Sequence, residues 1–218
     1  MQPPFVEYFT REAWLKARTG IGGSDASAIL GLNPYKNNAD VWMEKTGRAV
    51  PEDISGKPYV KYGIEAEEYL TALFALDHPQ YEVRANKTFR VYYHPEHRFI
   101  AGTLDGELTE KETGRPGILE IKTTEILNSM HREKWNDQVP MNYFVQCLHY
   151  LLATSWNFVI LKAQLKTVYG EEVRLNTRHY HIERADVQED LDYLLRKEIE
   201  FWNYVKTDRK PPLVLPPI

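Results

Sequence analysis

Apolar residues recur every three or four positions in several stretches of the chain, which is the spacing of one face of an amphipathic helix. Short helices are expected over residues 11–18 and 24–30, and Ser24 or Asp25 fits the N-cap position of the second. A longer helix is expected from Ala66 onward. Its recurring apolar residues are Tyr69, Leu70, Leu73 and Phe74. The first third of the chain is therefore predicted to be mainly helical.

The middle of the chain is rich in residues that favour strands. We expect strands over residues 88–92, 98–104, 107–109 and 118–123. The last two strands are separated by the polar loop 110–117, which contains Gly and Pro and is typical of a hairpin.

The last third of the chain returns to helices around one further strand. That strand is expected over residues 158–165, and Asp186 with Glu189 has the pattern of a capping box that opens a long helix. His179 and His181 are expected on one face of an edge strand. The apolar stripes of the two helices are Tyr143, Phe144, Cys147, Leu148, Leu151 and Leu152, and then Val187, Leu191, Leu194, Leu195, Ile199 and Trp202. Helices before and after a hairpin-rich sheet predict an α/β or α+β domain built in layers.

The composition is that of a globular protein, with 218 residues of which 43% are hydrophobic and 27% charged. We expect a single domain over residues 1–218 that ends in an extended, proline-rich tail from about Lys210. The single cysteine, Cys147, excludes a disulfide framework within the chain and any site that needs four cysteines.

Location and charge narrow the classes of function. The N-terminus lacks the basic and apolar regions of a secretion signal, and no apolar run approaches the ~20 residues that cross a bilayer, so a cytoplasmic protein without membrane contact is expected. The net charge of −4 argues against a protein that coats nucleic acid non-specifically. It does not exclude an enzyme with one local basic groove, because net charge is not patch charge.

The sharpest chemical feature is Asp105, at the end of one predicted strand, followed by Glu120 and Lys122 in the next hairpin strand. Alternate residues of a strand share a face, so Glu120 and Lys122 are expected to point together, and the hairpin can bring Asp105 beside Glu120. Two carboxylates, with the Ile121 carbonyl as a further ligand, suit Mg²⁺ or Mn²⁺, which can activate a water and offset charge on a phosphate. The spacing alone leaves open an exposed strand that follows an unrelated turn.

These residues also resemble a known family. Asp105, Glu120 and Lys122 match the core of the PD-(D/E)xK nucleases, and the surrounding chain resembles the lambda exonuclease/YqaJ viral recombinase family. The resemblance spans Trp14 to Tyr150 and implies a restriction-endonuclease-like core with a mixed central sheet flanked by helices. Leu104 stands where the family has a proline. Four further segments occur in the family's order: 13–26, which contains R-T-G-I-G-G-S-D, then 31–36, 62–67 and 140–146.

The resemblance implies further site residues. Glu67 would hold the attacking water or a second metal, and Gln146 would bind that water or the scissile phosphate. Arg18 and Ser24 match the family's 5′-phosphate pocket, and a guanidinium with a hydroxyl near a helix N-terminus suits an anion. Lys36 is a further candidate for phosphate binding. Taken singly, each of these residues also fits a solvated surface position.

The function that the resemblance implies is a metal-dependent 5′→3′ exonuclease acting on double-stranded DNA ends in phage or prophage recombination. Such enzymes leave a 3′ single strand, often work as a trimeric ring and act beside a single-strand annealing protein. Two alternatives stay open: a structure- or sequence-specific endonuclease on the same core, and a catalytically silent protein that binds DNA ends. The presence of Asp105, Glu120 and Lys122 together argues against the silent alternative.

Overall fold

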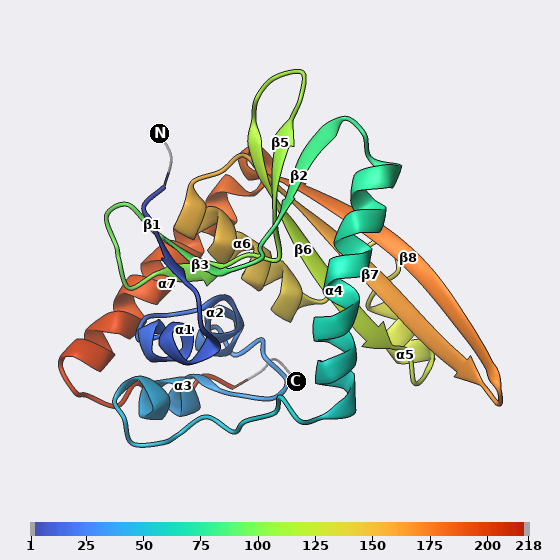
Figure 1. Cartoon of the computed structure of the whole chain (residues 1–218). Coiled ribbons are helices and arrows are strands. Elements are labelled where there is room, and N and C mark those ends of the chain that lie inside the picture. The colour runs from blue at the N-terminus through green and yellow to red at the C-terminus, as the bar shows by residue number, and fades with distance from the viewer. Residues whose placement is uncertain (1–2, 216–218) are drawn as a thin grey trace.

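The strands of the protein form two sheets (Figure 1). The structure, a computed structural model, describes residues 3–215. The larger sheet has the order β2-β5-β6-β7-β8, in which β6 and β7 are parallel and the other neighbours antiparallel, and the smaller sheet is an antiparallel β1-β3-β4. The predicted mixed sheet is confirmed. The strands are β1 (Phe5–Tyr8), β2 (Tyr81–Ala85), β3 (Phe89–Tyr93), β4 (Ala101–Thr103), β5 (Gly106–Glu110), β6 (Pro116–Glu125), β7 (Phe158–Tyr169) and β8 (Glu172–Glu183).

Helices cover both faces of the larger sheet, as predicted for a layered α+β domain. The helix α4 crosses one face, and α6 with α7 lies on the other, as Figure 1 shows. The short helices α1, α2 and α3 gather beside the end of α7. The helices are α1 (Arg11–Ala17), α2 (Gly23–Ile29), α3 (Asn38–Lys45), α4 (Pro58–Asp77), α5 (Ser129–Glu133), α6 (Met141–Thr154) and α7 (Gln188–Lys206), with a 3₁₀ turn at Arg184–Val187.

The strand β6 determines which side chains reach the space between the sheet and α6, because its alternate residues face different layers. Ile118 packs in the core cluster that contains α6, whereas Leu119 and Ile121 pack in the cluster that contains α4. Glu120 and Lys122 therefore share the face of Ile118 and point towards α6.

The tail lies against α3. Residues 209–215 contain neither helix nor strand. The buried side-chain amide of Asn38 donates to the Pro212 carbonyl at 2.7 Å, and its Oδ1 accepts the Val214 N–H at 3.0 Å. The predicted tail and single domain also include residues 216–218 and 1–2, which lie outside the described residues.

The predicted start of the second helix is wrong. The helix α2 begins at Gly23 with Gly22 as its N-cap, rather than with Ser24 or Asp25 in that position. Asp25 instead lies in the first turn, where its carboxylate accepts the Gly22 N–H at 3.1 Å. This bond satisfies a donor that a helix start leaves free, so the helix can begin earlier.

The predicted capping box at Asp186 and Glu189 is also wrong. The strand β8 ends at Glu183 and passes directly into the 3₁₀ turn, so Asp186 already lies inside a helical turn and is not in the extended conformation of an N-cap. The helix α7 follows with Val187 at its N-cap, and no side chain caps it.

Other boundaries differ where contacts come from far along the chain. The predicted strand 98–104 is reduced to β4, because the His94 ring nitrogen accepts the N–H groups of Glu96 and His97 and turns the chain before it. The sequence pattern does not predict β1 or β2, and α4 begins before Ala66. The predicted hairpin is confirmed as β5 and β6, and His179 with His181 lies on β8 at the sheet edge.

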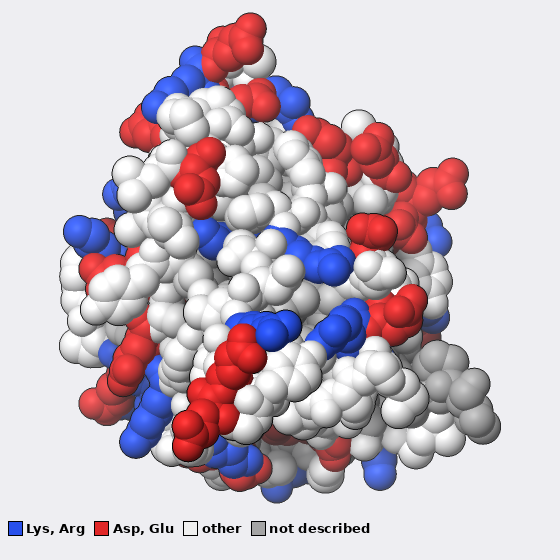
Figure 2. Space-filling model, turned by 90° about the vertical axis from the view of Figure 1, so that its right-hand side faces the viewer, with Lys and Arg blue, Asp and Glu red and all other residues white. Residues whose placement is uncertain are grey.

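The charged side chains are unevenly distributed. Figure 2 shows the side of the molecule on which α4 and the β7–β8 hairpin lie, with a row of Lys and Arg across the middle of a mainly uncharged surface. A local positive region therefore coexists with a net charge of −4. Among residues 3–215, no helix is long and apolar enough to cross a membrane.

Candidate active site

Asp105 lies where β6 extends beyond the start of β5. Gly106, the first residue of β5, pairs with Leu119, so Ile121 lies past the end of this ladder. The Asp105 carboxylate accepts the Ile121 N–H at 2.8 Å and replaces the missing strand partner. The hairpin thereby holds Asp105 next to Glu120, as the sequence predicts.

Glu120 has one paired and one unpaired carboxylate oxygen. Its Oε1 accepts a hydrogen bond from Gln146 Nε2 at 2.9 Å and lies 2.6 Å from Lys122 Nζ. Its Oε2 is buried and has no hydrogen-bond partner among residues 3–215, and the side chain is 1% exposed. Leaving a charged oxygen buried without a donor costs free energy, so Oε2 marks a place where a cation or water is expected.

The electrostatics around Glu120 show an excess of negative charge. Burial raises the pKa of Glu120 to about 8, the Asp105 carboxylate adds to this rise, and Lys122 opposes it. Burial also raises the pKa of Asp105. Burial disfavours the charge on Lys122, but the two carboxylates outweigh it and raise the pKa of Lys122. One ammonium thus faces two carboxylates, which leaves room for another positive charge.

Glu67 brings a third carboxylate from α4. It is half-buried, whereas its neighbours Glu65 and Glu68 are exposed. Burial raises the pKa of Glu67 to about 8, the Asp105 carboxylate adds to the rise, and Lys122 lowers it. Glu67 is therefore the glutamate of α4 that interacts with the other candidate residues, as the family spacing predicts.

The donors present fit a hard divalent cation. No three His, Cys, Asp or Glu side chains form a ready-made metal cage within the described range 3–215. Mg²⁺, however, is usually held by one or two carboxylates, with waters and substrate phosphate oxygens completing its shell. The unpaired Glu120 Oε2 beside Asp105 offers such a partial shell. The Ile121 carbonyl stays a predicted ligand.

A pocket of about 200 Å³ lies next to the carboxylates and is lined by Arg18, Ser24 and Gln146. Gln146 joins the two places, because it lines the pocket and its amide donates to Glu120. The Arg18 guanidinium lies 4.8 Å from the centroid of the Trp14 ring, which supports it by a cation–π contact. The structure thus brings both predicted phosphate-binding residues, Arg18 and Ser24, close to the predicted catalytic residues.

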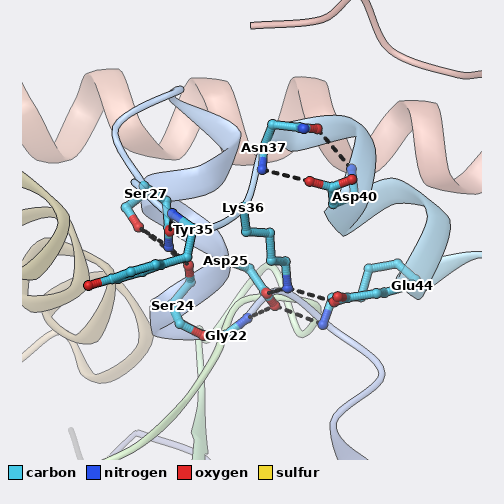
Figure 3. A network of polar contacts seen from close by, with 11 residues as sticks. Gly22, Ser24, Asp25, Ser27, Tyr35, Lys36, Asn37, Asp40 and Glu44 are labelled. Carbon is cyan, nitrogen blue, oxygen red and sulfur yellow. Dashed lines mark hydrogen bonds and ion pairs between the residues drawn. The ribbon is translucent and has the colours of Figure 1, made fainter. Parts of the chain in front are cut away.

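Lys36 lies in a network of ion pairs around α2 and does not line this pocket (Figure 3). Its Nζ is 2.9 Å from Asp25 Oδ1 and 2.6 Å from Glu44 Oε2. The structure therefore does not bring Lys36 to the predicted phosphate pocket, because two carboxylates already hold its ammonium group.

Lys45 and Tyr150 are among the other residues that line the pocket. The Tyr150 hydroxyl accepts a hydrogen bond from Gln146 Nε2 at 2.8 Å. The Tyr150 ring packs directly against Gly23 and Gly102. A Cβ added at Gly23 would lie 2.8 Å from the ring, and one added at Gly102 would lie 2.7 Å from it, so neither position has room for a side chain. Tyr150 follows Gln146 by four residues, and this helical spacing would have predicted Tyr150 as a neighbour of the site. No motif of the sequence points to Lys45.

Comparison with known families matches residues 13–157 to the YqaJ-like viral recombinase domain. The chain belongs to this family. It is 35% identical over 205 residues to YqaJ of Bacillus subtilis (strain 168), a protein described as uncharacterized, and the match covers 89% of this chain. The chain covers 56% of that relative, and so spans little more than half of its length.

Solved structures confirm the type of fold. The alkaline exonuclease LHK-Exo from Laribacter hongkongensis superposes with a TM-score of 0.67 at 14% identity, covering 90% of this chain and 93% of that one. A phage related exonuclease from Haemophilus somnus 129PT gives a TM-score of 0.56 at 12% identity, covering 87% of this chain and 96% of the other. The YqaJ-like chain therefore has the PD-(D/E)xK type of fold.

Proposed function

We propose that this YqaJ-like protein is an Mg²⁺-dependent exonuclease that degrades one strand of double-stranded DNA in the 5′→3′ direction and leaves a 3′ single strand. Mn²⁺ would substitute for Mg²⁺. Membership of a viral recombinase family and a fold shared with solved exonucleases support this proposal.

The observation that carries the proposal is the position of Gln146. Its amide donates to Glu120, beside the unpaired oxygen, and its side chain lines the pocket of Arg18 and Ser24. A terminal phosphate in that pocket would lie a short way from a scissile phosphate at the carboxylates. Such an arrangement would favour cleavage near an end, and a 5′-phosphate bound at Arg18 and Ser24 would account for the proposed direction.

The roles of the individual residues follow from their surroundings. Asp105 and Glu120, with the Ile121 carbonyl, would hold the metal, which when bound activates water and offsets charge on the phosphate. Lys122 holds Glu120 in place and can donate to a phosphate oxygen with a remaining N–H. Glu67 and Gln146 would orient the attacking water.

The proposed partners are DNA ends, further copies of the chain and a single-strand annealing protein. A trimeric ring would reconcile a net charge of −4 with DNA binding, since only the lining of the channel must be basic. The row of Lys and Arg in Figure 2 supports a local basic surface of this kind.

The proposal is tested with a linear duplex that carries one 5′-phosphorylated strand labelled at its 3′ end. Wild type and Glu120→Gln are each incubated with Mg²⁺ or with EDTA, and a covalently closed circle of the same sequence is treated in parallel. We expect Mg²⁺-dependent loss of the 5′-phosphorylated strand by wild type only, with the circle intact.

Two results would overturn the proposal in different ways. Cleavage of the closed circle would assign the protein to the endonucleases. Binding of the duplex end without cleavage in Mg²⁺ or Mn²⁺ would assign it to the silent end-binding proteins.

A further inference from the structure

The pocket next to the carboxylates contains two cationic side chains, Arg18 and Lys45, which come from different helical segments. Arg18 follows α1, and Lys45 is the last residue of α3. Lys45 lines the pocket with a side chain that is 10% exposed. Its ammonium group lies 2.7 Å from Asp25 Oδ2, the oxygen that accepts the N–H of Gly22, and Gly22 also lines the pocket. The pocket thus has a second cationic residue, Lys45, that no sequence motif predicts.

A single carboxylate, that of Asp25, fixes Lys45. Its Oδ2 lies 2.7 Å from Lys45 Nζ and accepts the Gly22 N–H at 3.1 Å, so it also holds the chain at the start of α2. Its Oδ1 lies 2.9 Å from Lys36 Nζ (Figure 3). Asp25 therefore places the backbone and one ammonium group on the same side of the pocket.

The two lysines of this network differ in the number of carboxylates that hold each ammonium group. Lys36 is held by two carboxylates, those of Asp25 and Glu44, whereas Asp25 is the only carboxylate within 4 Å of Lys45 in the described part of the chain. An ammonium group has three donors. Lys45 therefore faces the pocket with donors that are not used by carboxylates.

A count of the charges shows how positive the pocket is. The carboxylates of Asp25 and Glu44 balance the ammonium groups of Lys36 and Lys45. Only the positive charge of Arg18 is then left unbalanced, so the pocket is weakly positive. A terminal phosphate carries about −1.5 to −2 charges near neutral pH, against one for an internal phosphodiester, so a second cation matters more for the terminal group.

We propose that Lys45 is the second cationic contact of the 5′-terminal phosphate and that Asp25 is the residue that positions it. This inference rests on the proposed function, and it replaces Lys36 by Lys45 in the phosphate-binding set. Lys45 and Arg18 hold the terminal phosphate from two sides, while Gln146 links the pocket to the carboxylates.

The test compares two lysines that share Asp25 and differ in whether they line the pocket. Short duplexes with a 5′-phosphate or a 5′-hydroxyl are titrated with wild type, Lys45→Met, Lys36→Met and Lys45→Arg in EDTA, and binding is followed by fluorescence anisotropy. We expect wild type to prefer the 5′-phosphate and Lys45→Met to lose about tenfold of that preference, the scale of one hydrogen bond to a charged group. Lys36→Met should keep the preference, and Lys45→Arg should restore most of it.

The design separates this inference from the proposed function, because binding in EDTA needs no cleavage. An unchanged preference in folded Lys45→Met, or an equal loss in Lys36→Met, would show that Lys45 only stabilises the fold and would overturn the inference. Absence of any 5′-phosphate preference in wild type would overturn both the inference and the proposed direction. Lys45→Gln, which keeps a donor for Asp25, takes the place of Lys45→Met if that variant does not fold.

Discussion

Two buried clusters of this protein pair carboxylates with lysines, and they differ in whether the charges balance. Around Glu120, two carboxylates face one ammonium group, one oxygen has no hydrogen-bond partner within residues 3–215, and the pKa of Glu120 rises to about 8. Around Asp25, two lysines hold both oxygens. Burial would raise the pKa of Asp25, but Lys45 and Lys36 lower it well below its usual value.

The comparison teaches how to separate a reactive cluster from a supporting one by counting partners. The charges of the balanced cluster are paired within the chain, so Asp25 stabilises the fold and fixes the position of Lys45 at the pocket. The unbalanced cluster is incomplete in the protein alone and gains from a cation that the chain does not supply. Removing a carboxylate should therefore have opposite effects on stability in the two places.

The largest expected effect is that of Glu120→Gln on activity. The change removes a proposed metal ligand together with the unpaired charge, so DNA cleavage should fall to background, while the metal-free protein should unfold at a temperature no lower than that of wild type at pH 8. Cleavage assays and thermal unfolding in EDTA measure the two effects. Glu65→Gln on the exposed side of α4 is the control and should change neither. A clear loss of stability in Glu120→Gln would mean that the cluster is not unbalanced.

The next largest effect is that of Asp25→Asn on stability. It leaves the two lysines without their shared counter-charge, and breaking a buried ion pair in this way typically costs about 3–5 kcal/mol. Denaturant unfolding measures the loss. The exposed pair of Glu12 and Lys16 provides the contrast, since Glu12→Gln should cost at most about 1 kcal/mol. Similar costs for both variants would contradict the supporting role of the Asp25 cluster.

Gln146→Ala should reduce cleavage by about 10–100-fold, the range seen when a residue that orients a metal ligand is removed. The expected cause is loss of its hydrogen bond to Glu120, which leaves that carboxylate less firmly placed. Asn142→Ala, one turn earlier on α6, is the matched control and should stay near wild type. Equal activity of the two variants would show that the amide has no part in the reaction.

The smallest expected effect is a slope of stability with pH in the metal-free protein. The folded pKa of Glu120 is raised to about 8 from its usual value of 4.5. The folded state therefore binds more protons between these values, and the free energy of unfolding should fall as pH rises through that window. Unfolding in EDTA at a series of pH values measures the slope. It should be shallower in Glu120→Gln, and Mg²⁺ should stabilise wild type most at the alkaline end. An identical slope in the variant would assign the pH dependence to other groups.

His149 contributes to the same slope from a different place. It is fully buried, and its Nδ1 lies 2.7 Å from Glu198 Oε1. Burial lowers the pKa of His149, but the Glu198 carboxylate and the Ala101 carbonyl raise it by more, so the pKa is raised overall. Because the pKa of His149 is higher in the folded state, protonation of His149 stabilises the fold fully below pH ~6.5. This contribution is lost as the pH rises through the pKa of His149 in the folded state. This part of the slope should persist in Glu120→Gln.

The sequence predicts the hairpin that carries Asp105 and Glu120 well because the pattern that determines it is local. Asp105, Glu120 and Lys122 lie within one hairpin, and strand alternation fixes which of them share a face. Gln146 and Tyr150 are similarly accessible because helical spacing places them on one side of α6.

The sequence does not predict features that depend on partners far along the chain. The strand β2 pairs with β5, and the buried pair of His149 and Glu198 joins α6 to α7 across 49 residues, so neither shows in a short window. Lys36 and Lys45 are the clearest case. The sequence singles out Lys36 and not Lys45, and only the placement of α3 shows that two carboxylates hold Lys36 while Lys45 lines the pocket.

The two hydrogen bonds of Asn38 to the tail have a consequence for the order of folding. They close loops of 174 and 176 residues, and contacts of such long sequence separation form late because loop closure is entropically costly. Asn38 begins the helix that ends at Lys45. A chain that has formed its carboxylate hairpin but not yet docked residues 212–214 would lack the two bonds that hold the start of α3, the helix that brings Lys45 to the pocket.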